Sequence, residues 1–109
     1  MILIENREVF LKSFKSYHLF EFVFENPEKI NFIKKLSMNF AGFDYINNWD
    51  ALLDVMRGFY KLEKDYIIII IETKNKDNVV FGQFDSIVDD VNEFLKSSSK
   101  KIIFALKIG

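Results

Sequence analysis

The sequence predicts an α/β fold, with a three-stranded parallel sheet packed with helices. The run from Tyr66 to Ile71 is continuously apolar and rich in isoleucine, which is typical of a strand buried on both faces in the centre of a parallel sheet. From residue 17 onward, the apolar periodicity indicates strand, helix, helix, strand, helix and strand, joined by short links. This alternation favours parallel strands connected by right-handed crossovers.

The first and last of these strands are expected at residues 17–24 and 102–108. In the first, Leu19, Glu21 and Val23 lie on one side, and mainly phenylalanines lie on the other. His18, on the phenylalanine side, is the only histidine. We interpret it as structural, because no second histidine is available to form a metal-binding pair.

The first helix is expected to begin at Asn26, a suitable N-cap, with Pro27 in the first helical position. Its buried face would carry Ile30, Ile33 and Leu36, and it would end near Asn39.

The last helix is expected to span Phe84 to Leu95, with Asp85 as a candidate cap. Residues 79–81 would re-enter the protein before it, with Gly82 breaking the apolar run.

The stretch 47–59 predicts an amphipathic helix with an unusual charge pattern. Asn48 is a suitable N-cap and Gly58 a suitable stop. Asp50 and Asp54 are four residues apart and lie one turn apart on one face, where like charges cost roughly 0.2–0.5 kcal/mol. Taken alone, this face is that of an ordinary solvated helix, with Arg57 reducing the repulsion one turn on.

The loop before this helix, residues 40–46, is rich in aromatic side chains. Phe40 and Phe43 are expected to fill the core, whereas Asp44 and Tyr45 are expected to face outward.

Length and composition indicate one domain, residues 1–109, with enough apolar residues to build a core. The absence of cysteine excludes disulfides, thiolate-bound zinc and a thiol nucleophile, and fits a reducing compartment. A formal net charge of −1 provides no global field that would select nucleic acid or an anionic membrane. Any electrostatic function must therefore be local.

Residues 1–16 are an N-terminal extension of unclear structure. Their apolar side chains, among them Ile2, Ile4 and Phe14, indicate a short strand followed by a strand or helical turn that packs on the domain. No targeting segment is recognisable, and the longest apolar run falls far short of the roughly 20 residues that span a bilayer. We therefore expect a soluble, cytoplasmic protein.

Catalytic motifs are missing from the sequence. It has no glycine-rich phosphate loop, nucleophile elbow or zinc-binding helix motif, and its serines have no evident histidine and aspartate partners. The one arrangement that suggests an enzyme is a magnesium site formed by Asp44, Asp50 and Asp54. We expect no enzyme activity and no cofactor.

The residues Asn48-Trp49-Asp50-Ala51-Leu52-Leu53-Asp54, followed by Gly58-Phe59, resemble the hallmark helix of the barstar family. These proteins are intracellular inhibitors of barnase-type ribonucleases. The resemblance implies a small α/β fold with a three-stranded parallel sheet, which the expected element order matches from Tyr17 to Gly109.

The resemblance also implies partner-binding residues. Asp54 matches the family's most important acid and Asp50 the second. The remaining matches are Asn48, Gly58, Phe59 and Tyr45, with Glu93 as the expected third acid on the later helix. Three positions depart from the family: Ile46 replaces a glycine, Asp44 replaces an interface aromatic residue, and Leu53 replaces a common tryptophan.

The family mechanism gives the two acids a physical purpose. Acids about 5–6 Å apart on one helix face resemble neighbouring RNA phosphates and can bind the basic cleft of a ribonuclease. The expected protein is thus a monomer that inhibits such a ribonuclease in a 1:1 complex, as an immunity protein, without binding nucleic acid or membrane itself. The alternatives are a barstar-fold module that binds a partner other than a ribonuclease, and the magnesium-dependent enzyme.

Overall fold

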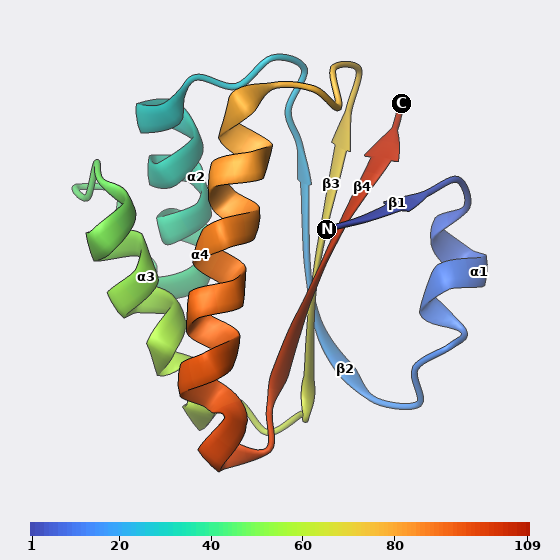
Figure 1. The fold of residues 1–109 in the computed structure, drawn as a ribbon, viewed down its shortest axis with the longest axis vertical. Coiled ribbons are helices and arrows are strands. Elements are labelled where there is room, and N and C mark those ends of the chain that lie inside the picture. Colours follow the sequence, from blue (N-terminus) through green and yellow to red (C-terminus); the bar gives the residue numbers. More distant parts are fainter.

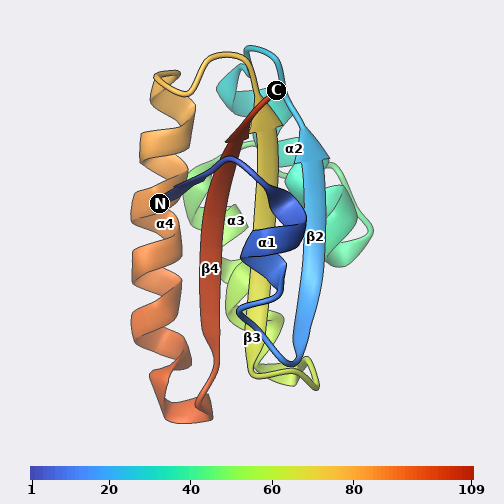
Figure 2. The ribbon, with the colours of Figure 1, turned by 90° about the vertical axis from the view of Figure 1, so that its right-hand side faces the viewer.

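The computed structural model describes all 109 residues and shows a four-stranded parallel sheet with helices on both faces (Figure 1, Figure 2). The strands are β1 (Ile2–Ile4), β2 (Tyr17–Val23), β3 (Tyr66–Thr73) and β4 (Lys101–Ile108), in the spatial order β1-β4-β3-β2. The helices are α1 (Arg7–Leu11), α2 (Lys29–Ala41), α3 (Trp49–Arg57) and α4 (Val79–Leu95), with 3₁₀ turns η1 (Gly58–Lys61) and η2 (Lys96–Ser98).

The connections explain why helices cover both faces. From β2 through β3 to β4 the chain crosses the sheet in one direction, and α2, α3 and α4 all lie on one face (Figure 1). The connection from β1 to β2 crosses in the opposite direction and carries α1 on the other face. Reversing both direction and face keeps the same hand of crossover, as the handedness rule for parallel strands requires.

The predicted central strand is confirmed. All five residues of the isoleucine run 67–71 are buried. Ile67, Ile69 and Ile71 belong to the large core beneath α2, α3 and α4, whereas Ile68 and Ile70 belong to a smaller cluster beneath α1. The alternation predicted for β2 is also confirmed, since Phe20, Phe22 and Phe24 all face the large core.

The sheet has four strands, one more than the three expected. Ile2 to Ile4 form β1, which pairs in parallel with residues 105–107 of β4. Leu11 of α1 then packs in the cluster that covers Ile68 and Ile70. The extension 1–16 therefore adds an edge strand to the sheet and covers its second face. A short strand followed by a helical turn is among the expectations for residues 1–16, but its place in the sheet was missed because its partner lies far along the sequence.

The start of α4 differs from the expectation. The helix begins at Val79, because the Asn78 side chain accepts a hydrogen bond from the Val80 backbone N–H at 2.9 Å and caps it. Val80 and Phe81 continue the buried face that includes Phe84, and Gly82 lies inside the helix. Asp85 is therefore an interior helical residue and not a cap.

Both ends of α2 also differ. Its N-cap is Glu28, without a side-chain cap bond, whereas the Asn26 side-chain oxygen accepts hydrogen bonds from the side-chain amides of Asn78 (2.7 Å) and Asn75 (3.3 Å). Asn26 thus ties the link after β2 to the link after β3. The helix ends at Ala41 with Gly42 at φ 80°, and Ile30 is exposed instead of buried.

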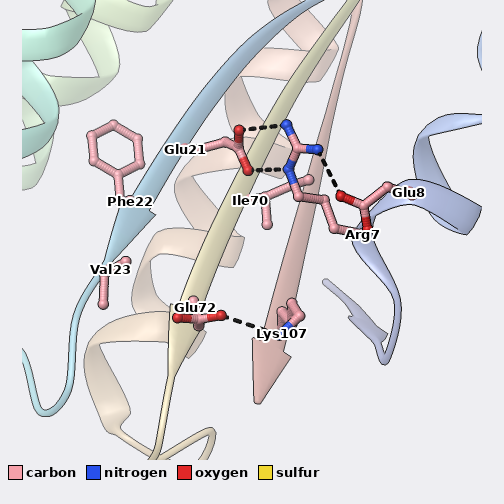
Figure 3. A pocket seen from close by; sticks show the side chains of 8 residues that line it. All are labelled: Arg7, Glu8, Glu21, Phe22, Val23, Ile70, Glu72 and Lys107. Carbon is pink, nitrogen blue, oxygen red and sulfur yellow. Dashed lines mark hydrogen bonds and ion pairs between the residues drawn. The ribbon is translucent and has the colours of Figure 1, made fainter. Parts of the chain in front are cut away.

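The face of the sheet that α1 covers also carries charged side chains. Arg7 crosses to β2, where its guanidinium binds both carboxylate oxygens of Glu21, at 2.7 Å for the Nη2 bond, and also contacts Glu8 at 3.2 Å (Figure 3). Lys107 pairs with Glu72 at 3.1 Å nearby. These side chains surround a shallow pocket of about 290 Å³. No helix in the structure has the length and apolar character needed to cross a membrane.

The Arg7–Glu21 pair gives the fold a dependence on acid. Hydrogen bonds from Arg7 lower the pKa of the Glu21 carboxyl below its ordinary value. A lowered folded-state pKa contributes stability that is present above the unfolded pKa, about 4.3, and is lost as the pH falls through the folded value.

We therefore expect Glu21→Gln to reduce the loss of unfolding free energy between about pH 5 and pH 2. The measurement is urea unfolding across that pH range. Arg7→Gln should flatten the acid limb in the same way, because it removes the cause of the shift. An acid limb as steep in Glu21→Gln as in the parent would contradict this assignment.

Candidate protein-binding face

Helix α3 forms the outer side of the helical layer, packed against α2 and α4 (Figure 1). Leu52 and Met56 are fully buried and fix its inner face. Asp50 and Asp54 project from the opposite side and are exposed. The structure therefore places the two predicted acids on one accessible helix face.

The two acids differ in their surroundings. Asp54 forms an ion pair with Arg57 one turn further on, at 3.0 Å, and both side chains are largely exposed. Asp50 has no ion-pair partner among the eight salt bridges of the structure. Half of the acid pair thus has no internal cation, which leaves its charge available to a partner.

Small residues lie beside the acids. At 100° per residue, Ala51 and Gly58 occupy the angular sector next to Asp54 on the outer side of the helix. Gly58 has a helical φ of −64°, and a Cβ added there would meet no atom within 4 Å. The fold itself does not require glycine at this position. The strip beside the acids is therefore low, and a partner can approach the backbone closely.

Asn48 caps the helix as predicted. Its side-chain oxygen accepts a hydrogen bond from the Ala51 backbone N–H at 2.8 Å, and the residue is exposed. It therefore fixes the first turn that carries Asp50, whether or not it also contacts a partner.

Phe59, expected at the partner-binding face, lies in the core. Its side chain is only 4% exposed, and its ring stacks on Phe20 at 5.6 Å and meets Phe40 edge-on at 5.1 Å. The reason is the 3₁₀ turn η1, which directs Phe59 inward at the end of α3. In this structure its role is to anchor that end of the helix to the sheet.

The loop before α3 presents an exposed aromatic ring. Tyr45 is 76% exposed and stacks on Phe43, with ring centroids 4.6 Å apart. The buried Ser37 hydroxyl donates to the Phe43 carbonyl at 2.8 Å and fixes the loop. Asp44 is exposed beside it, whereas Ile46 packs against the core. The outward positions of Asp44 and Tyr45 are confirmed.

Helix α4 joins this face through a contact that the sequence did not reveal. The Arg57 guanidinium lies 5.4 Å from the centroid of the Phe94 ring. Asp90 is one turn from Phe94 on that side of α4, whereas Glu93 points about 100° away from Phe94 and pairs with Lys96 at 2.9 Å. Asp90 is therefore better placed than Glu93 to add an acid to the face. In the sequence, the four-residue spacing between Asp90 and Phe94 indicates that both lie on the same side of the helix.

The magnesium hypothesis receives no geometric support. The structure contains no group of three or more histidine, cysteine, aspartate or glutamate side chains that could hold a metal ion. Asp44, Asp50 and Asp54 are thus not brought together as a set of ligands.

Comparisons of the chain with protein-family models, curated proteins and solved structures found no match.

The cap of α3 can be tested in the free protein. We expect Asn48→Ala to lower the unfolding free energy by about 1 kcal/mol, because it removes the acceptor for the Ala51 N–H. Asn48→Ser should restore most of this loss, since serine also caps helices well. Urea unfolding of the three proteins measures both effects, and equal stability of Asn48→Ala and the parent would exclude a cap of this strength.

Proposed function

We propose that this protein inhibits a barnase-type ribonuclease by placing the acidic face of α3 in the enzyme's basic cleft. The observation that carries the proposal is the exposed pair Asp50 and Asp54, held on a capped helix whose inner face is buried. The pair opposes the stability of the free helix, since like charges one turn apart repel. A basic partner turns that repulsion into attraction.

The arrangement of elements supports a barstar-like fold within the larger sheet. Strands β2, β3 and β4 are consecutive, parallel and adjacent, and two helices, α2 and α3, separate the first two. This is the order that the resemblance implies, with β1 and α1 as an addition. Helix α1 lies on the face of the sheet opposite α3, and β1 lies at the sheet edge beside β4 (Figure 1). The addition therefore leaves the acidic face unobstructed.

The binding mechanism follows from charge and relief. Asp50 and Asp54 are one helical turn apart, close to the spacing of successive phosphates, and can accept charge-assisted hydrogen bonds from arginine, lysine or protonated histidine. Ala51 and Gly58 let the partner approach the helix. Opposite local fields also speed the encounter, an effect that salt weakens.

Arg57 distinguishes this face from a purely acidic one. It occupies Asp54 in the free protein and is held over Phe94, so a partner's cation must displace it or bind beside it. This observation favours a second candidate, a partner that is not a ribonuclease. The surface of that partner would carry an anion next to its cations. The two candidates separate on whether a ribonuclease binds and loses activity.

Asp54→Ala tests the acid pair directly. We expect the variant to fold as the parent does, because the side chain is exposed, and to bind a barnase-type ribonuclease at least about 2 kcal/mol more weakly, as loss of an interface hot spot does. Calorimetric titration and parallel RNA cleavage assays measure binding and inhibition, at low and at moderate salt.

Asp89→Ala, on the far side of α4, is the matched control, because it removes one exposed acid without touching α3. Equal binding by Asp54→Ala and the parent would overturn the proposal. Absence of binding by the parent itself, to several such ribonucleases, would favour the second candidate.

Gly58→Ala separates stability from function. Because Gly58 is helical and has open space at its Cβ, we expect alanine to raise the unfolding free energy by about 0.5–1 kcal/mol. The added methyl group projects from the proposed face, so ribonuclease binding should weaken. Urea unfolding and calorimetry measure the two effects, and a variant that gains stability without any loss of affinity would place the interface away from Gly58.

A further inference from the structure

Six lysines gather at the edge of the sheet where β2, β3 and β4 begin. They come from the segments 12–16, 61–65 and 100–101, which lead into the three strands and lie at the same end of the molecule (Figure 1, Figure 2). The lysines of this basic end are Lys12, Lys15, Lys61, Lys64, Lys100 and Lys101. With Glu63 and Asp65 the three segments have a net charge of +4, in a chain whose total is −1.

None of these lysines forms an ion pair, although the structure contains eight salt bridges elsewhere. Even Glu63 and Asp65, in the same segments, make none. Glu63 and Asp65 thus reduce the charge of the basic end without forming ion pairs, and the remaining charge of +4 is available to an anionic ligand.

Backbone contacts hold the segments in place. The Lys101 backbone N–H donates to the Asp65 carbonyl at 3.0 Å, and the Lys100 ammonium donates to the Lys64 carbonyl at 3.1 Å. The Phe14 ring packs against Tyr66, with centroids 5.2 Å apart, and joins segment 12–16 to the start of β3. The positive charges are therefore presented by an ordered surface.

A groove runs between two of these segments. Its volume is about 610 Å³, and Lys15 and Lys64 line it together with Glu63, Asp65 and the aromatic rings of Phe14 and Tyr66. The hydroxyls of Ser13 and Ser16 complete the lining. The net positive charge of the basic end therefore comes from the lysines around the groove, Lys12, Lys61, Lys100 and Lys101. Tyr66 is 40% exposed. On the neighbouring turn, Tyr60 is 48% exposed, with the Lys61 ammonium 5.6 Å from its ring centroid. Cations, exposed aromatic faces and hydroxyl donors thus occur together.

We propose that this basic end binds single-stranded nucleic acid. Unpaired lysines attract backbone phosphates, and exposed tyrosine rings provide faces on which bases stack, a combination that binds single strands with little sequence preference. An anionic membrane fits less well, because the groove has no exposed aliphatic side chain that could anchor in the lipid. The basic end shares no residue with the acidic face, although Lys61 and Gly58 belong to the same turn η1, so the inference does not depend on the proposed inhibition.

The test uses fluorescein-labelled 12-mers of oligo(U) and oligo(dT), with anisotropy measured on the full chain as salt is raised from about 50 to 200 mM. We expect saturable binding with a dissociation constant below about 100 µM at the lower salt. Equal affinity for the two oligomers would indicate recognition of phosphates and bases alone, and tighter binding of oligo(U) would add the 2′-hydroxyl.

The double variant Lys15→Glu/Lys64→Glu should weaken binding at least tenfold and reduce the slope of log affinity against log salt by about 1.4, or about 0.7 for each lost phosphate contact. Lys29→Glu/Lys34→Glu is the matched control, because it changes the net charge equally on exposed positions of α2. Asp54→Ala should leave nucleic-acid binding unweakened. Circular dichroism verifies that each variant is folded.

Two results would overturn the proposal. One is the absence of saturable binding to either oligomer at the lower salt, including the case in which vesicles of phosphatidylserine and phosphatidylcholine bind instead. The other is an equal loss of affinity in the control double variant, which would mean that only the overall charge matters. Neither result bears on inhibition of a ribonuclease, which the Asp54 and Gly58 variants test separately.

Discussion

Burial of the isoleucine run in β3 on both sides is the constraint on which this structure depends. A strand without a polar face cannot border water, so apolar cover is needed above and below it. Three helices cover one face of the sheet, and the short helix α1 covers the other. Helix α3 lies on this foundation, held by α2 and α4 through its buried Leu52 and Met56. The direction of its acidic side follows from that packing.

Most of the fold could be predicted from local sequence patterns. The isoleucine run, the alternation of β2 and the cap at Asn48 were predictable because each depends on residues within one element. The start of α4 was missed because Gly82 suggested a break, although Val80 and Phe81 keep the helical period. A short strand within residues 1–16 was expected, but its membership in the sheet could not be predicted, since that depends on pairing with the distant β4.

In the candidate site, too, features set by the local sequence were predictable, and features set by contacts between elements were not. The exposure of Asp50, Asp54 and Tyr45 follows from helix period and loop position, and it was predictable. The burial of Phe59 was not, because a 3₁₀ turn changes the direction of the chain just after Gly58. Contacts between elements can be recognised only when the topology is known. Examples are Arg57 over Phe94 and the lysines that three distant segments bring together.

The pairing of β1 with β4 also constrains the order in which the protein can fold. Ile2 to Ile4 find their partners at residues 105–107, so the first strand must wait for the last to be in place. Strands β2 and β3 with their helices can associate earlier, through contacts that close shorter loops. On a ribosome, β1 would lack its partner strand until residues 105–107 emerge. The sheet is therefore completed at its β1 edge only once β4 has formed.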